Sequence, residues 1–396
     1  MKYANPPKVS PLSSDGRLLL GPGPSNVSPA VLRAMSVPLV GHLDKEFLDM
    51  METSQEMLRY LFQTHNQLTI PISATGSAGM EACFVNLVEP GDKVLVGING
   101  VFGKRMADVA QRCQAEVVVI EKAWGEIFTP AEVIEAVNRE KPKLVALVHA
   151  ETSTGALQPL EEIGAYLKST DSLLLIDCVT SLAGTPVLID EWSVDAAYSG
   201  TQKCLSAPPG LAPITFSPKA EQVLKNRKSK VQSWYLDVSM LAQYWGDERV
   251  YHHTAPISML YGLYEALRLV CEEGLENRWN RHRDNHRGLA AGLQALGLDY
   301  NCPEDYRLPQ LNAVKVPDGV DDVKVRQRLW KDHQIEIGGG LGDFKGKVWR
   351  IGLMGESSTQ ANVLSFLGCL EQALLAEGYQ LKAGSSVAAA NEVFNS

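Results

Sequence analysis

Between residues 65 and 215, short apolar stretches alternate with amphipathic ones, and this constrains the fold more than any other feature of the 396-residue chain. We expect strands at 93–96, 116–120, 144–148, 173–176 and 196–198, and helices at 78–88, 107–113 and 130–140. Strand, helix and strand in this order predict a mostly parallel sheet covered by helices on both faces. Ligands of such sheets bind beyond the carboxyl ends of the strands.

The pattern divides the chain into a large α/β domain and a smaller C-terminal α+β domain. Residues 21–273 form the large domain, and residues 274–383 form the small one. The small domain is expected to contain helices at 276–296 and 320–331 and strands at 312–316, 335–337 and 348–353. Residues 1–20 are expected to be an extended arm whose Leu18-Leu19-Leu20 docks on an apolar surface, with a partner subunit as one candidate. The Ala/Ser-rich tail, residues 384–396, is expected to fray.

Composition excludes several classes of partner. The net charge of −9 provides no basic field for nucleic acid or anionic lipid, and no apolar run approaches the roughly 20 residues that span a bilayer. The seven cysteines are scattered without a Cys-x-x-Cys pair, which favours a reducing compartment. Without a secretory leader pattern either, we expect a cytoplasmic protein. Adjacent His252 and His253 have no third ligand at a matching spacing, so no metal site is expected.

A lysine and an aspartate indicate the chemistry. Lys203 follows Ser, Gly and Thr in 199–203, where few charges would keep its amine protonated, as capture of an aldehyde cofactor requires. Asp177 ends the apolar run 173–176, and a carboxylate there could keep the pyridine nitrogen of pyridoxal 5'-phosphate (PLP) protonated. Each residue also has a simpler interpretation, because such aspartates commonly cap a helix and most lysines are solvated.

Further residues fit the same cofactor. Small residues at 73–79 precede a helix and could cradle a phosphate, although Ser77 could equally be a simple N-cap. Phe102 could stack on the cofactor ring or be an ordinary core residue. Thr152 lies in a Ser/Thr-rich turn after strand 144–148 and could contact the cofactor edge.

Two positions point to the substrate. Arg350 is surrounded by apolar residues in 348–353, and it could clamp a substrate carboxylate or form a structural ion pair. Gly23 lies in a Gly-Pro-Gly-Pro turn, whose prolines lack the backbone donors of a nucleotide loop. That turn is expected to bring backbone close to the ligand.

The chain resembles the class V (fold type I) PLP-dependent aminotransferases, most closely the alanine:glyoxylate (serine:pyruvate) family. The shared motifs are Gly21-Pro22-Gly23-Pro24-Ser25-Asn26, Tyr198-Ser199-Gly200-Thr201-Gln202-Lys203, Ala207-Pro208-Pro209-Gly210 and Arg350-Ile351-Gly352-Leu353. The resemblance implies that Lys203 is the Schiff-base lysine, Asp177 the pyridinium partner and Arg350 the carboxylate clamp. It implies that the other cofactor contacts are Thr75, Gly76, Ser77, Phe102, Thr152, Val179 and Gln202, with Tyr251 and Thr254 reaching the neighbouring site of a homodimer.

Two residues depart from the pattern of the family. Phe102 stands where relatives carry a stacking Trp, and it offers less area and no indole donor. Thr152 stands where relatives often have Ser. Both changes keep the chemistry but leave cofactor affinity and substrate preference open.

The resemblance implies ping-pong transamination from a small amino acid, alanine or serine, to glyoxylate or another 2-oxo acid. Two alternatives remain. A cysteine desulfurase of the same class would need a nucleophilic cysteine on a loop, for which Cys302 is the candidate, and commonly a His before the lysine, where this chain has Gln202. A non-catalytic PLP-binding protein is the other alternative, because a fold alone proves no activity.

Overall fold

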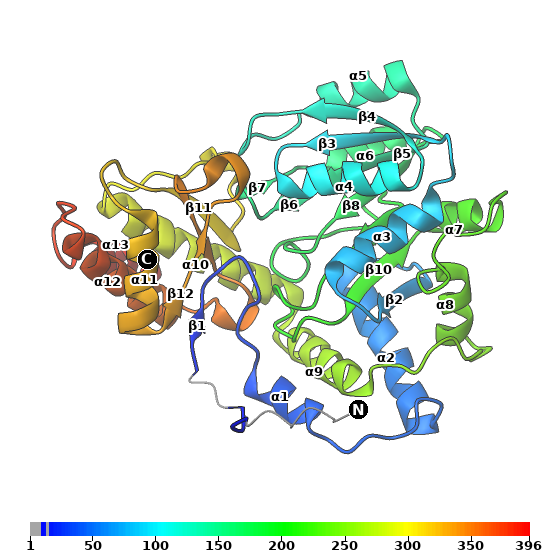
Figure 1. Cartoon of the computed structure of the whole chain (residues 1–396), viewed down its shortest axis with the longest axis horizontal. Helices are drawn as coiled ribbons and strands as arrows, with labels where there is room; N and C mark the ends of the chain where they lie inside the picture. The colour runs from blue at the N-terminus through cyan, green and yellow to red at the C-terminus, as the bar shows by residue number, and fades with distance from the viewer. Residues whose placement is uncertain (1–8, 13–15) are drawn as a thin grey trace, which may run out of the picture.

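The computed structural model describes residues 9–12 and 16–396, and the part of the expected arm at 1–8 and 13–15 lies outside the described residues. Its main element is a large sheet with the strand order β2-β10-β9-β8-β5-β3-β4 (Figure 1). Neighbouring strands run parallel except at β10, which is antiparallel to both β2 and β9. The predicted mostly parallel α/β fold is confirmed. The strands are β2 (Leu68–Ile72), β3 (Lys93–Ile98), β4 (Glu116–Glu121), β5 (Leu144–Val148), β8 (Leu173–Asp177), β9 (Ala196–Tyr198) and β10 (Ala212–Phe216).

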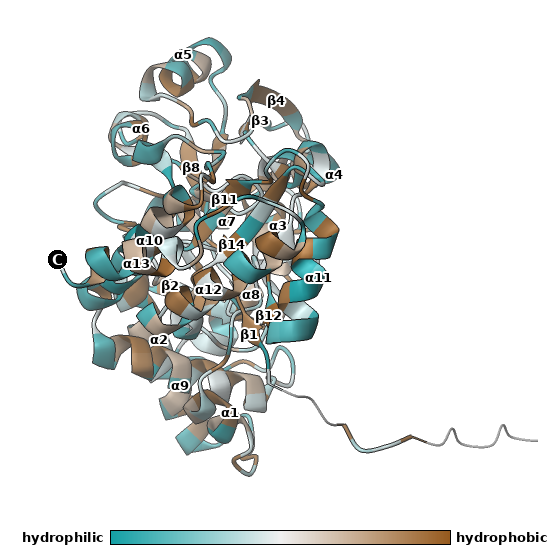
Figure 2. Cartoon of the chain, turned by 90° about the vertical axis from the view of Figure 1, so that its left-hand side faces the viewer, coloured by the Kyte–Doolittle hydropathy of each residue, from teal (hydrophilic) through white to brown (hydrophobic). Residues whose placement is uncertain are grey.

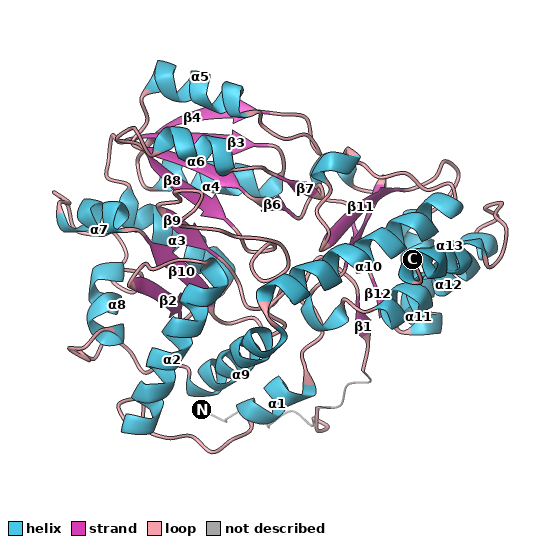
Figure 3. Ribbon diagram, turned by 180° about the vertical axis from the view of Figure 1, so that it is seen from behind, coloured by secondary structure: helices cyan, strands magenta, loops and turns pink. Residues whose placement is uncertain are grey.

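Helices cover both faces of this sheet. Figures 1 and 3 view the molecule from opposite sides, with α3 and α4 on the near face in Figure 1 and α6 on the near face in Figure 3. The central strands β5 and β8 are buried along their whole length, which explains their unbroken runs of Leu, Val and Ile. The helices around the sheet are α2 (Lys45–Phe62), α3 (Gly76–Leu87), α4 (Val101–Arg112), α5 (Pro130–Glu140), α6 (Glu161–Leu167), α7 (Pro218–Lys225) and α8 (Val238–Trp245).

Local sequence explains where these helices begin and end. In α5, Thr129 and Glu132 form a reciprocal capping box, Pro130 occupies the first turn, and Lys141 ends the helix in a left-handed conformation. The predicted bounds of α5 are therefore correct. Helix α4, in contrast, begins at Val101, six residues before the predicted start at 107.

The part of the chain after Glu273 forms a small sheet with its own hydrophobic cluster. Its strand order is β11-β14-β13, and the buried Trp349 and Ile351 of β14 contribute to that cluster. Helix α10 (Leu275–Ala295) extends from the end of α9 (Ile257–Glu273) across to α12 and α13 (Figure 3). The remaining elements of this C-terminal part are β11 (Leu311–Lys315), β12 (Ile335–Glu336), β13 (Gly338–Gly339), β14 (Val348–Gly352), α11 (Asp322–His333), α12 (Gln360–Ala376) and α13 (Ser385–Phe394).

The expectation that residues from 384 onward fray is wrong, because they form helix α13. Ser386 and Ala390 are buried, and Glu371 of α12 accepts hydrogen bonds from the N–H groups of Gly384 and Ser386. The side chain of Phe394 packs against Gly288 of α10. Helix α13 is therefore packed on α10 and α12 as part of the second hydrophobic cluster (Figure 1).

The segment Leu18-Leu19-Leu20 docks on the protein's own C-terminal part. Strand β1 (Leu18–Leu19) pairs in parallel with β12, and Leu20 is buried in the small-domain hydrophobic cluster. The apolar surface expected for Leu18-Leu19-Leu20 is thus supplied in the same chain. Helix α1 (Pro29–Met35) follows and packs on α9.

Helix α11 is largely hydrophilic in Figure 2. Its Val325 and Leu329 are buried, whereas most of its charged residues are at least partly exposed. No helix among residues 9–12 and 16–396 is long and apolar enough to cross a membrane.

Candidate active site

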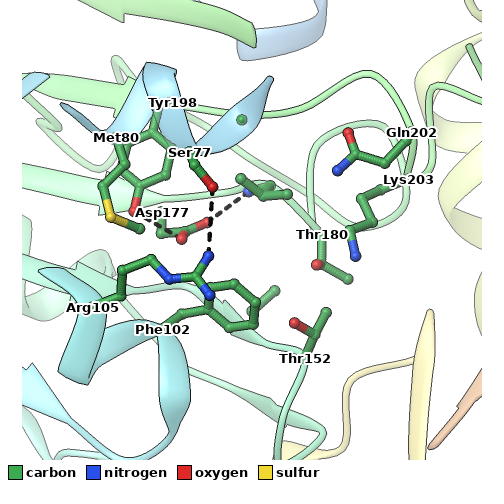
Figure 4. A pocket seen from close by; sticks show the side chains of 13 residues that line it. Ser77, Met80, Phe102, Arg105, Thr152, Asp177, Thr180, Tyr198, Gln202 and Lys203 are labelled. Carbon is green, nitrogen blue, oxygen red and sulfur yellow. Dashed lines mark hydrogen bonds between the residues drawn. The ribbon is translucent and has the colours of Figure 1, made fainter. Parts of the chain in front are cut away.

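A cavity of about 190 Å³ lies at the carboxyl ends of the central strands of the large sheet (Figure 4). Asp177 ends β8 and Tyr198 ends the neighbouring β9, while Lys203 comes from the loop after β9. Figure 4 shows Asp177 and Lys203 entering the cavity from different sides. Eight of the predicted site residues line it: Gly76, Ser77, Phe102, Thr152, Asp177, Val179, Gln202 and Lys203.

Asp177 is fixed by two hydrogen bonds. The Val179 N–H donates to its Oδ1 at 2.9 Å, and the Tyr198 hydroxyl donates to its Oδ2 at 2.8 Å. Burial raises the pKa of Asp177 to about 6, and these two hydrogen bonds work against the shift. Asp177 therefore caps a turn, not a helix, and its carboxyl group is mainly ionised at neutral pH.

The amine of Lys203 is buried beside the predicted glycine turn. Its Nζ donates a hydrogen bond to the carbonyl oxygen of Pro22. Burial, together with the nearby positive charge of Arg350, lowers the pKa of Lys203 to about 8. Gly23 has a φ of +107°, and a Cβ there would lie 2.6 Å from Lys203 Nζ, so this position accepts only glycine without moving the amine. Lys203 is thus not an ordinary solvated lysine.

The N-terminus of α3 opens into the same cavity. Thr75 is the N-cap residue without a side-chain capping bond, and Ser77 lies within the first turn, so the interpretation of Ser77 as a simple N-cap is wrong. Within the described residues, the backbone N–H groups of Gly76 and Ser77 have no hydrogen-bond acceptor. Free N–H groups at a helix N-terminus favour an anion.

The start of α4 is capped by the loop after β5. Of this loop, only Thr152 was predicted to be a site residue. The fully buried Glu151 accepts hydrogen bonds from the N–H of Phe102 at 3.0 Å and from the Ser153 hydroxyl at 2.6 Å. Ser153 Oγ in turn accepts from the Val101 N–H at 3.0 Å. Burial raises the pKa of Glu151, and its hydrogen bonds oppose the shift. The cap fixes Phe102, which both packs on the core and lines the cavity.

Arg350 lies on β14 of the small sheet, and its side chain extends to the Thr152 loop of the large sheet. Its Nε donates to Gly339 O at 2.8 Å, and its Nη1 reaches Thr152 O at 3.4 Å. Burial lowers the pKa of Arg350 to about 10, and Glu151 acts in the opposite direction. Among the described residues Arg350 forms no ion pair, so the alternative of a structural ion pair is not observed.

Tyr251 and Thr254 lie outside the cavity of their own chain. Their hydroxyls are 3.4 Å apart, and Tyr251 is 57% exposed. The intervening His252 stacks on Trp234, and His253 Nε2 lies 2.7 Å from Ser73 Oγ, at the entrance to α3. The expected role of Tyr251 and Thr254 in a neighbouring subunit's site stays a prediction.

Comparison with known proteins decides the family. The "Aminotransferase class-V" family profile matches residues 19–342. The chain belongs to the class-V aminotransferases. It is 42% identical to the (S)-ureidoglycine–glyoxylate transaminase of Bacillus subtilis, over 96% of this chain and 95% of that protein. It is 44% identical to the alanine–glyoxylate aminotransferase of Felis catus, over 92% of this chain and 89% of that one.

Solved structures agree with this assignment. An alanine–glyoxylate aminotransferase from Nostoc sp. has a TM-score of 0.91 at 52% identity, covering 93% of this chain and 97% of that chain. The ureidoglycine–glyoxylate aminotransferase from Bacillus subtilis has a TM-score of 0.96 at 43% identity, covering 98% and 100%. The predicted family and its fold are confirmed for this class-V aminotransferase.

Several cavity residues of this class-V aminotransferase were missed from sequence. Tyr198 could have been found, because β8 and β9 are parallel neighbours whose register places Tyr198 opposite Asp177. Arg105 was missed because α4 was expected to begin at 107, beyond it. With the true start at Val101, Phe102 and Arg105 are three residues apart and share a helix face. The complete set of missed lining residues is Met80, Arg105, Ala150, Thr180 and Tyr198.

Proposed function

We propose that this protein is a PLP-dependent aminotransferase that moves the amino group of a small amino acid, alanine or serine, to glyoxylate. One observation carries the proposal: a desolvated lysine amine and a buried carboxylate, Lys203 and Asp177, line a single cavity. An aldehyde cofactor with a basic ring nitrogen needs one group of each kind.

The residues present fit PLP. The N–H groups of Gly76 and Ser77 suit its phosphate, and the aromatic face of Phe102 suits its ring. Gln202 Oε1 is buried in the cavity wall without a hydrogen-bond partner among the described residues, so it has an acceptor to offer to a polar group of the cofactor. Thr75, Thr152 and Val179 complete the proposed contacts.

When bound, PLP supplies an electron-accepting ring that stabilises the charge left on Cα when the donor loses its proton. Asp177 would keep the ring nitrogen protonated, and a proton there would in turn favour the ionised form of Asp177. Lys203 would hold the aldehyde of the cofactor, and its free amine could serve as the base at Cα, because a lowered pKa of about 8 leaves part of it neutral near pH 7.

Arg350 is proposed to hold the carboxylate of the substrate. Its guanidinium is largely buried, and only Nε and Nη1 donate hydrogen bonds within the described residues, leaving Nη2 for a ligand. In this proposal, the Gly23 turn bounds the substrate site on the side away from Arg350, next to the Lys203 amine. A substrate carboxylate bound between them would place its Cα within reach of Lys203.

Glyoxylate is the proposed acceptor because it appears in the names of both similar enzymes, from Bacillus subtilis and from Felis catus. The donors in those names differ. Small donors differ in binding by about 1–3 kcal/mol, which side-chain contacts alone do not rank. The donor is therefore an experimental question, and (S)-ureidoglycine belongs in the comparison beside alanine and serine.

The test is a donor panel with the PLP-loaded protein. Alanine, serine and (S)-ureidoglycine are each combined with glyoxylate or pyruvate, and the amino acid product is quantified. We expect glycine to form from glyoxylate with at least one donor, and the Lys203→Ala variant to give neither turnover nor the visible absorbance of bound cofactor. Absence of glycine with every donor, or full activity of Lys203→Ala, would reject the proposal.

Cysteine desulfuration is disfavoured by the environment of Cys302. Its thiol is buried and lies 3.2 Å from Tyr306 O, and burial raises its pKa to about 11. A thiol in that state is a poor nucleophile. Sulfide release from L-cysteine would revive this alternative, and PLP binding without any transamination would support the non-catalytic one.

We also propose a homodimer with shared sites and a cytoplasmic location. The exposed Tyr251 and Thr254 support the first, because they offer hydroxyls that their own cavity does not use. All seven cysteines are free, which supports a reducing compartment.

A further inference from the structure

Arg105 is a charged residue of the cavity to which the proposed chemistry gives no task. It lies on α4, and its Nη1 lies 3.5 Å from Ser77 Oγ of α3. Its guanidinium carbon also lies 4.9 Å from the centroid of the Phe102 ring. Figure 4 shows Arg105 beside Phe102 and directed toward Ser77. One side chain therefore links the N-terminus of α3 to the ring of Phe102.

Charge shows why this position matters. A phosphate monoester carries about 1.5 to 2 negative charges near pH 7, and the donors at the start of α3 are neutral N–H and hydroxyl groups. The charged residues that line the cavity are Arg105, Asp177 and Lys203. Asp177 has the wrong sign for a phosphate, and Lys203 is committed to the aldehyde. Among the described residues, Arg105 is therefore the remaining cation that lines the cavity.

The guanidinium is also available for a ligand. Within the described part of the chain Arg105 forms no ion pair with a carboxylate, and its recorded contacts are the long hydrogen bond to Ser77 and the face of Phe102. An arginine has five N–H donors in a planar fork that matches phosphate oxygens. Its neighbour Lys104 lies over the ring of Trp124 instead and does not line the cavity.

We infer that Arg105 binds the phosphate group of the cofactor and supplies the positive charge that the N-terminus of α3 lacks, while its guanidinium stays over the face of the Phe102 ring. This inference rests on the proposed function, because it assumes that PLP is the ligand. Both α3 and α4 would then contact the phosphate. The affinity for PLP would depend on the positive charge of Arg105.

The test compares PLP with pyridoxal, which has the same ring and aldehyde but no phosphate. Cofactor-free wild type, Arg105→Gln, Arg105→Lys and Lys104→Gln are titrated with each ligand, and binding is followed by the visible absorbance of the bound aldehyde. We expect Arg105→Gln to weaken PLP binding about 10- to 100-fold and to leave pyridoxal binding unchanged. Arg105→Lys should retain part of the PLP affinity, and Lys104→Gln should match wild type.

The outcomes separate this inference from the proposed function. Unchanged PLP affinity in Arg105→Gln, or an equal loss for PLP and pyridoxal, would overturn the phosphate role while leaving the wild-type enzyme a PLP protein. An equal loss in Lys104→Gln would overturn it too, because a general change in surface charge would then explain the effect. Failure of the wild type to bind PLP would reject the proposed function itself.

Discussion

At the scale of single residues, Asp177 shows how a site residue can oppose folding stability. Its folded-state pKa is about 6, against 3.8 for the free side chain. Because the folded protein holds this proton more tightly than the unfolded chain, the stability that Asp177 contributes is fully present below about pH 4 and is lost as the pH rises through 6. The ionised carboxylate at neutral pH therefore destabilises the cofactor-free fold.

This reasoning predicts that Asp177→Asn stabilises the cofactor-free protein and impairs the enzyme. An amide can still accept from the Val179 N–H, but it carries no charge. We expect its free energy of unfolding at pH 8 to exceed that of wild type by on the order of 1 kcal/mol, with a smaller difference at pH 5. Turnover should fall at least about tenfold, because hydrogen bonds to charged groups are worth about 1.5–3 kcal/mol.

Urea unfolding at the two pH values and steady-state kinetics check both parts. A variant that is less stable than wild type at pH 8 would contradict the account of Asp177 as a buried charge. Unchanged turnover would show that the Asp177 carboxylate has no role in the reaction.

At the scale of elements, the capping of α4 from the Glu151 loop holds one wall of the cavity. The Glu151 carboxylate accepts from the backbone of α4 and from Ser153, and replacing it by an amide presents N–H groups to N–H donors. We predict that Glu151→Gln lowers the free energy of unfolding by about 1–3 kcal/mol, the penalty for an unsatisfied buried group. PLP binding should weaken too, because Phe102 follows directly on the cap.

The matched control is Glu135→Gln, which removes the same charge from an exposed position of α5. It should change stability by less than about 0.5 kcal/mol. If Glu151→Gln unfolds at the same urea concentration as this control, the cap is not what holds the start of α4.

Elements whose ends are marked by local chemistry could be predicted from the sequence, and those that depend on distant partners could not. Helix α5 was predicted to the residue because Thr129, Pro130 and Glu132 lie next to one another. The start of α4 was missed because its cap comes from Glu151 and Ser153, about 50 residues further along the chain. In α13, Ser386, Ala390 and Phe394 recur at every fourth residue, which is the spacing of one helix face. The Ala/Ser-rich composition of the segment instead suggested a frayed tail.

At the scale of the whole molecule, two chains are needed for one complete site if Tyr251 and Thr254 serve the neighbouring cavity. Neither hydroxyl lines the cavity of its own chain, and Tyr251 is exposed. A closed two-fold dimer would present both residues to both sites. Residues of one subunit would then complete the phosphate site of the other.

This arrangement predicts complementation between two inactive variants. We expect Lys203→Ala and the double variant Tyr251→Ala/Thr254→Ala each to be strongly impaired alone. Refolded or co-expressed together at equal amounts, they should recover about a quarter of wild-type activity, because half of the dimers are mixed and each mixed dimer contains one intact site. Activity no greater than the sum of the two separate variants would show that each site is built from one chain.

The pairing of β1 with β12 connects the reactive amine to the small sheet. Leu20 N–H donates to Glu336 O, and Leu20 O accepts from Gly352 N–H, so this segment is bonded to both β12 and β14. Two residues later, the carbonyl of Pro22 accepts a hydrogen bond from Lys203, which follows β9 of the large sheet. A rotation of the small sheet relative to the large one would therefore also displace a hydrogen-bond acceptor of the Lys203 amine.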